Sequence, residues 1–121
     1  TITVFTNENI NDKKRKLQNV CGSVHHIAFS VSQSTIRIAE KNLKKNGFPN
    51  TGIKDRGFMD SLYFREPLGL LIELSCYKFL PPFGHSYAEV LQKAHKLRIK
   101  RGAKNIEDQD VSLAIRKLKN K

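Results

Sequence analysis

Residues 61–76 have the sequence SLYFREPLGLLIELSC, in which two strand-like runs flank a tight turn. The runs on either side are rich in apolar and aromatic residues, as β-strands are. Between them, Pro67 suits the first central position of a type I turn, and Gly69 suits the left-handed position that follows it. The pattern predicts a β-hairpin with a three-residue loop and a glycine bulge.

The length of this loop decides which side chains share a face of the hairpin. A three-residue loop places Glu66 opposite Leu70, and counting back along the two strands then places Tyr63 opposite Glu73. Residues directly opposite each other point to the same face of a sheet. A two-residue loop would shift the pairing by one residue and separate the phenol from the carboxylate. The turn residues therefore predict that Tyr63 and Glu73 lie side by side.

Glu73 stands between Ile72 and Leu74 in the apolar second strand. A carboxylate buried there without a partner would be costly. Two kinds of partner would compensate it, namely a basic side chain such as Arg65 or a divalent metal ion. The residues alone leave both open.

Residues 24–31, VHHIAFSV, predict another strand, and its two faces differ. Alternate side chains of a strand point to opposite sides. The bulky face carries His25, Ile27, Phe29 and Val31, and the smaller face carries Val24, His26, Ala28 and Ser30. The bulky face suits packing beneath a helix, and the smaller face suits the wall of a cavity. His26 is then either a metal ligand in that cavity or an ordinary hydrogen-bonded histidine.

A helix is expected directly after this strand. Ser32 or Ser34 can cap its start, apolar residues recur at helical spacing, and Gly47 stops it. This helix would cover the bulky face of residues 24–31. Turn residues and a short strand near residues 53–54 then lead to the hairpin.

Two more amphipathic helices are expected in the remainder of the chain. Ser86 and Glu89 form a capping box for the first, which runs as far as Gly102. The second spans residues 107–119, with its apolar residues on one side.

The chain divides into three segments by pattern. Residues 1–21 hold a short strand and a polar linker with a basic run, residues 22–80 hold the strand, helix and hairpin, and residues 81–121 hold the two last helices. Two further histidines lie in the last segment. We interpret His85 as a loop residue and His95 as a helix-surface residue, and neither as a metal ligand.

The composition is that of a small globular protein. With 121 residues, 39% of them hydrophobic, the chain can form one domain with a modest core. No run approaches the roughly 20 apolar residues of a membrane span, and the first residues lack the layout of a secretory signal, so a cytoplasmic protein without membrane contact is expected. Cys21 and Cys76 lack metal-site spacing and are expected as free thiols. Because the first residue is Thr1 rather than Met, the natural start is left open.

The net charge of +11 is concentrated in the last third of the chain. Residues 81–121 carry ten basic and four acidic side chains, a balance of +6. A basic segment can bind nucleic acid, but solvent-exposed lysine-rich helices give the same charge. The basic residues also spread around the first of the two helices and form no single reading face. The sequence therefore does not favour nucleic acid as a partner.

Together these motifs resemble the βαβββ module of the vicinal oxygen chelate superfamily, which includes glyoxalase I, fosfomycin resistance proteins and extradiol ring-cleaving dioxygenases. The stretches that carry the resemblance are GSVHHIAF at 22–29 and DSLYFREPLGLLIEL at 60–74, and about half of the chain is covered. The resemblance implies an α+β fold. It consists of a single βαβββ module with a curved mixed sheet, an N-terminal strand and linker, and two C-terminal helices.

The resemblance also implies roles for three residues. In that superfamily the residue before the apolar triplet of the first strand and a Glu on the last strand are metal ligands. These positions correspond to His26 and Glu73 here, with His25 on the other face. In extradiol dioxygenases a Tyr ten positions before that Glu bonds a substrate oxygen, which implies this role for Tyr63. The implied metal is Fe(II), with Mn(II) or Zn(II) as alternatives, and the implied substrate is a small catechol-like aromatic.

Part of an extradiol site has no counterpart in the sequence. Such a site uses two His and one carboxylate, and its first His comes from a preceding module. Its acid–base His lies shortly before the second metal-ligand strand, where residues 7–19 contain no His. A complete site needs a second βαβββ module, from a homodimer partner or a separately encoded half. The sequence therefore predicts half of a two-module ring-cleaving dioxygenase.

Two other functions are compatible with the same residues. A homodimer in which each chain contributes His26 and Glu73 would form the four-ligand site of a glyoxalase-like isomerase, which needs no redox-active metal. Alternatively, the chain is a binding module or a decayed half-enzyme without catalysis, with its basic helices as the working surface. Metal identity and metal content distinguish these functions.

Overall fold

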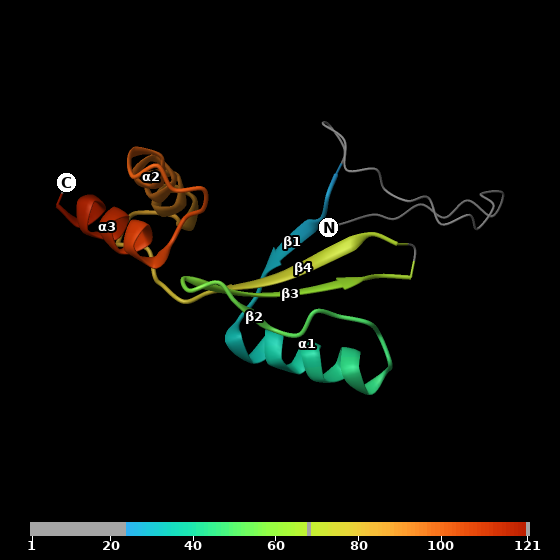
Figure 1. Ribbon diagram of the computed structural model, residues 1–121. Helices are drawn as coiled ribbons and strands as arrows, with labels where there is room; N and C mark the ends of the chain where they lie inside the picture. Colours follow the sequence, from blue (N-terminus) through green and yellow to red (C-terminus); the bar gives the residue numbers. More distant parts are fainter. Residues whose placement is uncertain (1–23, 68, 121) are drawn as a thin grey trace.

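The centre of the protein is a mixed four-stranded sheet (Figure 1), seen in a computed structural model that describes residues 24–67 and 69–120. The strands are β1 (Ile27–Ser30), β2 (Lys54–Asp55), β3 (Met59–Arg65) and β4 (Leu71–Tyr77), and the helices are α1 (Gln33–Lys45), α2 (Tyr87–Lys100) and α3 (Asp108–Lys119). The spatial order is β1-β4-β3-β2, with β1 parallel to β4 and the other pairs antiparallel. The predicted α+β class and βαβββ order are confirmed. The strand predicted near residues 2–5 lies outside the described residues.

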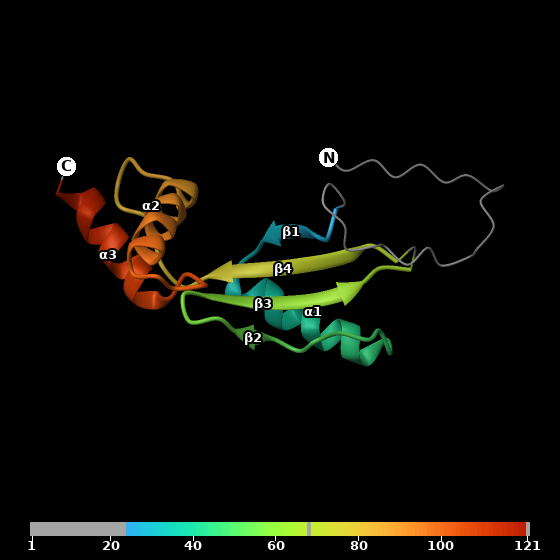
Figure 2. The ribbon, with the colours of Figure 1, turned by 45° about the horizontal axis from the view of Figure 1, so that its top comes forward.

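α1 lies against one face of the sheet (Figure 2) and has the predicted caps. The Ser32 hydroxyl accepts a hydrogen bond from the Thr35 N–H at 3.1 Å, which satisfies one of the free donors of the first turn. At the other end, Gly47 adopts a left-handed φ of 71°, and the Phe48 N–H donates to the Leu43 carbonyl at 2.9 Å. This is the Schellman arrangement that glycine permits after a helix.

The main core lies between α1 and the two central strands. Ile36 of α1 packs against Leu62 of β3 and Cys76 of β4, and all three are buried. The prediction that α1 covers the bulky face of residues 24–31 is only partly right. Val31 joins this core, whereas Phe29 remains 38% exposed. The reason is that β1 is a short strand at the edge of the sheet, and the buried side chain of α1 meets β3 and β4 instead.

The β3–β4 hairpin has the predicted turn and register. Gly69 has a φ of 96°, its N–H donates to the Glu66 carbonyl at 2.9 Å, and the Glu66 N–H donates to the Leu70 carbonyl at 3.1 Å. The ladder then pairs Tyr63 with Glu73. Because these residues are opposite each other, both side chains point to the face of the sheet that α1 does not cover.

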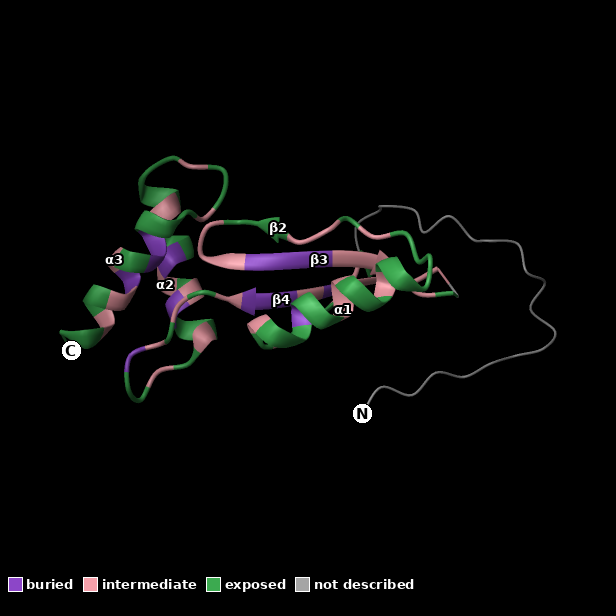
Figure 3. Cartoon of the chain, turned by 90° about the horizontal axis from the view of Figure 1, so that it is seen from below, coloured by how far each residue is buried: buried purple, intermediate pink, exposed green. Residues whose placement is uncertain are grey.

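α2 and α3 pack on each other around a second core (Figure 3). Its buried members are Val90, Ala94, Val111 and Ala114, and Phe58 and Phe79 pack against them from the sheet side. The predicted capping box is present, since the Ser86 N–H donates to the Glu89 carboxylate at 2.7 Å. The Arg101–Asp110 ion pair, at 2.7 Å, joins the end of α2 to the first turn of α3.

A stack of aromatic rings fixes these two helices at the end of the sheet. Tyr77, the last residue of β4, stacks on Tyr87, the first residue of α2, with ring centroids 4.8 Å apart and planes 20° apart. Phe79 contacts both rings. Figures 1 and 2 show α2 and α3 beyond the end of β4 and away from α1.

Two smaller findings complete the fold. None of the helices that the structure describes is long and apolar enough to cross a membrane. Cys76 is a buried free thiol, as predicted, and Cys21 lies outside the described residues. The division of the chain at residues 21 and 80 stays a prediction.

Candidate functional site

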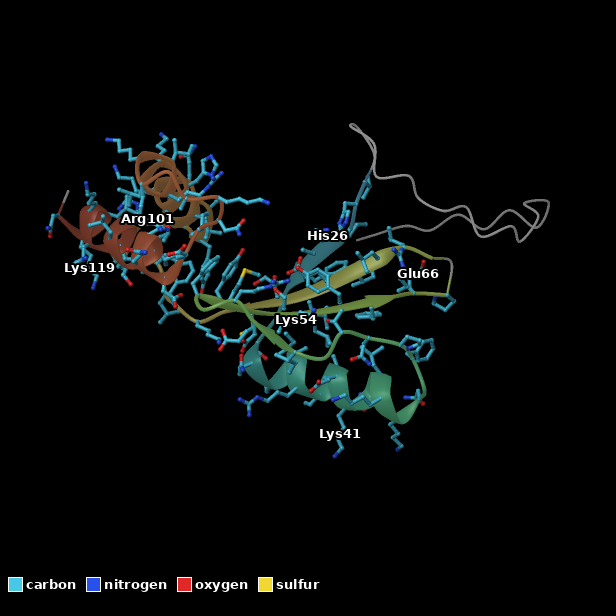
Figure 4. The ribbon with its side chains drawn as sticks, viewed as in Figure 1. His26, Lys41, Lys54, Glu66, Arg101 and Lys119 are labelled. Carbon is cyan, nitrogen blue, oxygen red and sulfur yellow. The ribbon has the colours of Figure 1, made fainter. Side chains whose placement is uncertain are left out.

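His26 and Glu73 meet on the sheet face opposite α1. The parallel pairing of β1 with β4 places Ala28 beside Glu73. His26 precedes Ala28 by two residues, and its Nε2 lies 2.9 Å from Glu73 Oε2. Figure 4 shows His26 on the side of the sheet away from Lys41 of α1. The two residues predicted as ligands of one metal are thus in direct contact.

Glu73 is the buried charge of this pair. It is 5% exposed, whereas 32% of the His26 side chain is exposed. The carboxylate accepts a hydrogen bond from His26 Nε2, which offsets part of the cost of burying it. Arg65, which the sequence offered as a partner, instead donates to the Gly69 carbonyl at 2.7 Å. The basic partner of Glu73 is therefore His26 itself.

The predicted position of His25 is wrong. It was expected on the face opposite His26, but His25 Nδ1 lies 2.7 Å from His26 Nδ1, and the two rings meet edge to face. The physical reason is that β1 begins only at Ile27. Strand alternation requires a paired, extended backbone, so it does not apply to the residues before the strand.

The Nδ1 to Nδ1 contact links the tautomers of the two histidines. One of the two nitrogens must donate and the other must accept. When His26 Nε2 donates to Glu73, a neutral His26 has a bare Nδ1 that accepts from His25. When His26 Nε2 carries no proton, the proton sits on His26 Nδ1, and His25 Nδ1 accepts a hydrogen bond from it. A histidine that binds a metal needs such an acceptor for its second nitrogen.

Tyr63 stands beside this pair at the predicted position. Its ring lies 5.8 Å from the His26 ring in an edge-to-face contact, and its backbone is paired with Glu73. Burial, and then the Glu73 carboxylate, raise the pKa of the Tyr63 phenol above its ordinary value of 10.0. The phenol is therefore a neutral hydrogen-bond donor at physiological pH.

The geometry of the pair fits a metal as well as a hydrogen bond. Bonds of about 2.0–2.2 Å from a metal to a His nitrogen and a carboxylate oxygen, at right angles, put the two donor atoms about 3 Å apart. The observed separation of 2.9 Å matches that value. Within residues 24–67 and 69–120, no three or more His, Cys, Asp or Glu side chains converge in a group that could hold a metal ion. The described chain thus brings together two side chains whose spacing would suit two ligands of one metal.

A cleft of 590 Å³ borders Tyr63 and extends from the sheet to the α2–α3 connection. Its lining comes from Arg56, Phe58, Met59, Ser61, Tyr63, His95, Arg98, Lys104, Asn105 and Ile106. No sequence pattern indicated this cleft, because its two sides come from segments about forty residues apart. His95 is exposed on α2, as predicted, but it also faces this cleft.

Comparison with known proteins shows what the chain is similar to. No protein-family model matches the chain. MhqA of Bacillus subtilis strain 168, named as a proposed ring-cleaving dioxygenase, is 44% identical to the chain over 66 residues. The resemblance to the vicinal oxygen chelate superfamily is confirmed. The matched region is 54% of this chain, and it spans 21% of the length of MhqA.

Two solved structures are similar to parts of the chain. One is a proposed dioxygenase from Bacillus subtilis, with a TM-score of 0.46 and 22% identity, covering 71% of this chain and 31% of that one. The other is a glyoxalase/bleomycin resistance protein/dioxygenase from Alicyclobacillus acidocaldarius, with a TM-score of 0.40 and 15% identity, covering 54% of this chain and 55% of that one.

Proposed function

We propose that this chain is the metal-binding module of a ring-cleaving dioxygenase and forms half of a two-module site. The observation that carries the proposal is the contact of His26 with Glu73 at 2.9 Å, on the sheet face that also holds Tyr63. The similarity to MhqA supports ring cleavage as the class of reaction and a small catechol-like aromatic as the substrate.

His26 Nε2 and Glu73 Oε2 would hold one divalent metal as adjacent ligands. Enzymes of this kind typically use such a metal, and a carboxylate combined with imidazole suits Fe(II). Fe(II) bound there would supply the redox chemistry that oxygen activation requires. Mn(II) could replace it in that role, whereas Zn(II) could not, since it has no redox chemistry.

The chain's own residues would orient the metal ligand and the substrate. His25 Nδ1 would accept a hydrogen bond from the His26 Nδ1–H, which keeps the proton on Nδ1 and leaves Nε2 free to bind the metal. The neutral phenol of Tyr63 donates a hydrogen bond to a substrate oxygen beside Glu73. Its raised pKa keeps the donor protonated over the range in which such an enzyme works.

A second module would complete the site. An Fe(II) site of this class needs a third protein ligand, and the described residues supply only two. β1 pairs with β4 on one side, and within the described part of the chain its other edge is open. A homodimer partner or another βαβββ module could therefore approach the site from this edge. A cytoplasmic location stays a prediction.

Oxygen consumption tests this function. The full chain is loaded with Fe(II) without oxygen and mixed with catechol and dissolved oxygen in an oxygen electrode. We expect consumption that is lost in Glu73→Ala and kept in His85→Ala, a histidine outside the site. If a partner copy completes the site, the rate per chain will rise with protein concentration. Equal rates for the wild type and Glu73→Ala would contradict the proposal.

A further inference from the structure

The cleft beside Tyr63 carries an unbalanced positive charge. Arg56, Arg98 and Lys104 line it together with His95, and no Asp or Glu does. Among the described residues, none of the three permanent cations has a carboxylate within 4.0 Å. Arg101, by contrast, lies outside this lining and bonds two carboxylates. The unpaired cations therefore face a space that can receive an anion.

Arg98 is held in place for such a contact. Its Nη1 donates to the carbonyls of Ala103 and Lys104 at 2.9 and 3.0 Å, and its Nε donates to His95 Nδ1 at 3.2 Å. These three bonds fix the plane of the guanidinium. No bond joins Nη2 to the part of the chain that the structure describes. A guanidinium held by its other nitrogens is preorganised to bind an oxyanion.

Ser61 is a second polar group in the lining of the cleft. It is fully buried in β3, and its Oγ lies beside the Tyr63 phenol without a short hydrogen bond to any described residue. A buried hydroxyl is normally satisfied, so this Oγ can take a further polar partner. Ser61 precedes Tyr63 by two residues and shares its face of the sheet. This further partner would thus lie next to Tyr63.

The other walls suit an aromatic ring. Phe58, Met59 and Ile106 provide apolar surface, and the volume of 590 Å³ falls in the range of small-molecule sites. Tyr63 belongs both to this cleft and to the His26–Glu73 site. A ring anchored in the cleft by an acidic group would therefore lie close to the candidate metal site.

We propose that this cleft binds the acidic group of an aromatic anion, and that the substrate of the dioxygenase site is a catechol with an anionic substituent. Arg56 and Arg98 would contact the oxyanion, and Ser61 would donate a hydrogen bond to it. The naming of a substrate rests on the function proposed above. The anion site itself requires no metal.

Benzoate and its neutral isostere benzamide test the anion site in protein freed of metal by a chelator. Calorimetric titration at low ionic strength should show benzoate binding at least ten-fold tighter than benzamide. Arg56→Gln and Arg98→Gln should each remove most of that preference. The two variants are compared because each side chain has one other role: Arg98 bonds the α2–α3 connection, and Arg56 contacts the Tyr63 phenol. Arg37→Gln removes the same charge from the exposed face of α1 and should leave binding unchanged.

Two results would overturn this inference. One is equal binding of benzoate and benzamide, and the other is an equal loss of benzoate binding in Arg37→Gln and Arg56→Gln, which would indicate charge alone. The outcome is separable from that for the metal site. If benzoate binding depends on Arg56 but the chain binds no Fe(II), the anion-site proposal is supported and the dioxygenase proposal is contradicted. If the chain binds Fe(II) but binds benzoate no more tightly than benzamide, only the anion-site proposal is contradicted.

Discussion

His26 Nε2 and Glu73 Oε2 lie 2.9 Å apart, although 47 positions separate the two residues in the sequence. The contact depends on the parallel pairing of β1 with β4, which α1 makes possible by crossing between the two edges of the module. The distance suits a hydrogen bond in the metal-free chain and adjacent ligands in the metal-bound chain. The same two atoms can therefore serve both states with little movement.

Glu73→Gln is expected to separate stability from metal binding. The amide oxygen can still accept from His26 Nε2, and the cost of burying a charge disappears. The free energy of unfolding of the metal-free protein should change by less than about 1 kcal/mol, as measured by urea denaturation. A loss of about 3 kcal/mol or more would instead show that the pair is a structural ion pair.

The same variant should change the titration of two tyrosines. Burial and the charge of Glu73 raise the pKa of both Tyr63 and Tyr77 above 10.0. Glu73→Gln removes the negative charge that opposes phenolate formation, so both pKa values should fall. Absorbance of the phenolate at alkaline pH measures this, with Tyr63→Phe identifying the contribution of Tyr63. Superimposable titrations of the wild type and Glu73→Gln would contradict the proximity of these groups.

Gly69→Ala should weaken the hairpin that sets the site. At a φ of 96° an alanine is strained by about 1–2 kcal/mol, and nothing else lies within 4 Å of the added Cβ. Gly47→Ala is the matched control, because Gly47 has a φ of 71° and equally open surroundings. Denaturation should show similar losses of stability for both variants. Only Gly69→Ala should also weaken metal binding, because only that turn sets the register of Tyr63 and Glu73.

The α2–α3 unit should be sensitive to acid through Asp110. The Arg101 guanidinium holds the pKa of this carboxyl below its ordinary value of 3.8. The unfolded chain therefore takes up the proton at a higher pH than the folded chain does. The stability from this group is complete above pH 3.8 and is lost as the pH falls through the lowered folded pKa.

Circular dichroism at 222 nm from pH 7 to pH 2 measures this loss of helix. Asp110→Asn should be less stable at pH 7 by about 1–3 kcal/mol, because two charge-assisted hydrogen bonds to Arg101 are weakened. It should also show a shallower dependence on pH below 4. Identical acid transitions in the two proteins would argue against the ion pair.

The local chemistry of the sequence predicted the hairpin well. Pro67 and Gly69 were sufficient to place Tyr63 opposite Glu73, because a turn of defined type fixes strand register over its neighbouring residues. The Ser32 cap and the Ser86–Glu89 capping box likewise marked the helix starts. These features depend on residues close together in the chain.

Features that depend on distant segments were missed or misplaced. His25 was assigned to the wrong face because strand alternation was extended past the residue where pairing with β4 begins. The cationic cleft was not foreseen, since the stack of Tyr77 on Tyr87 places α2 beside the sheet, and no periodic pattern encodes that contact. The second module that would complete the metal site also stays a prediction.

Anaerobic calorimetric titration with Fe(II) tests the central claim most directly. It compares the full chain with Glu73→Gln and with His85→Gln, which removes a histidine outside the site. We predict a saturable Fe(II) site in the wild type and in His85→Gln that is lost in Glu73→Gln. Unchanged Fe(II) affinity in Glu73→Gln would contradict the claim that His26 and Glu73 are the metal-binding half of the site.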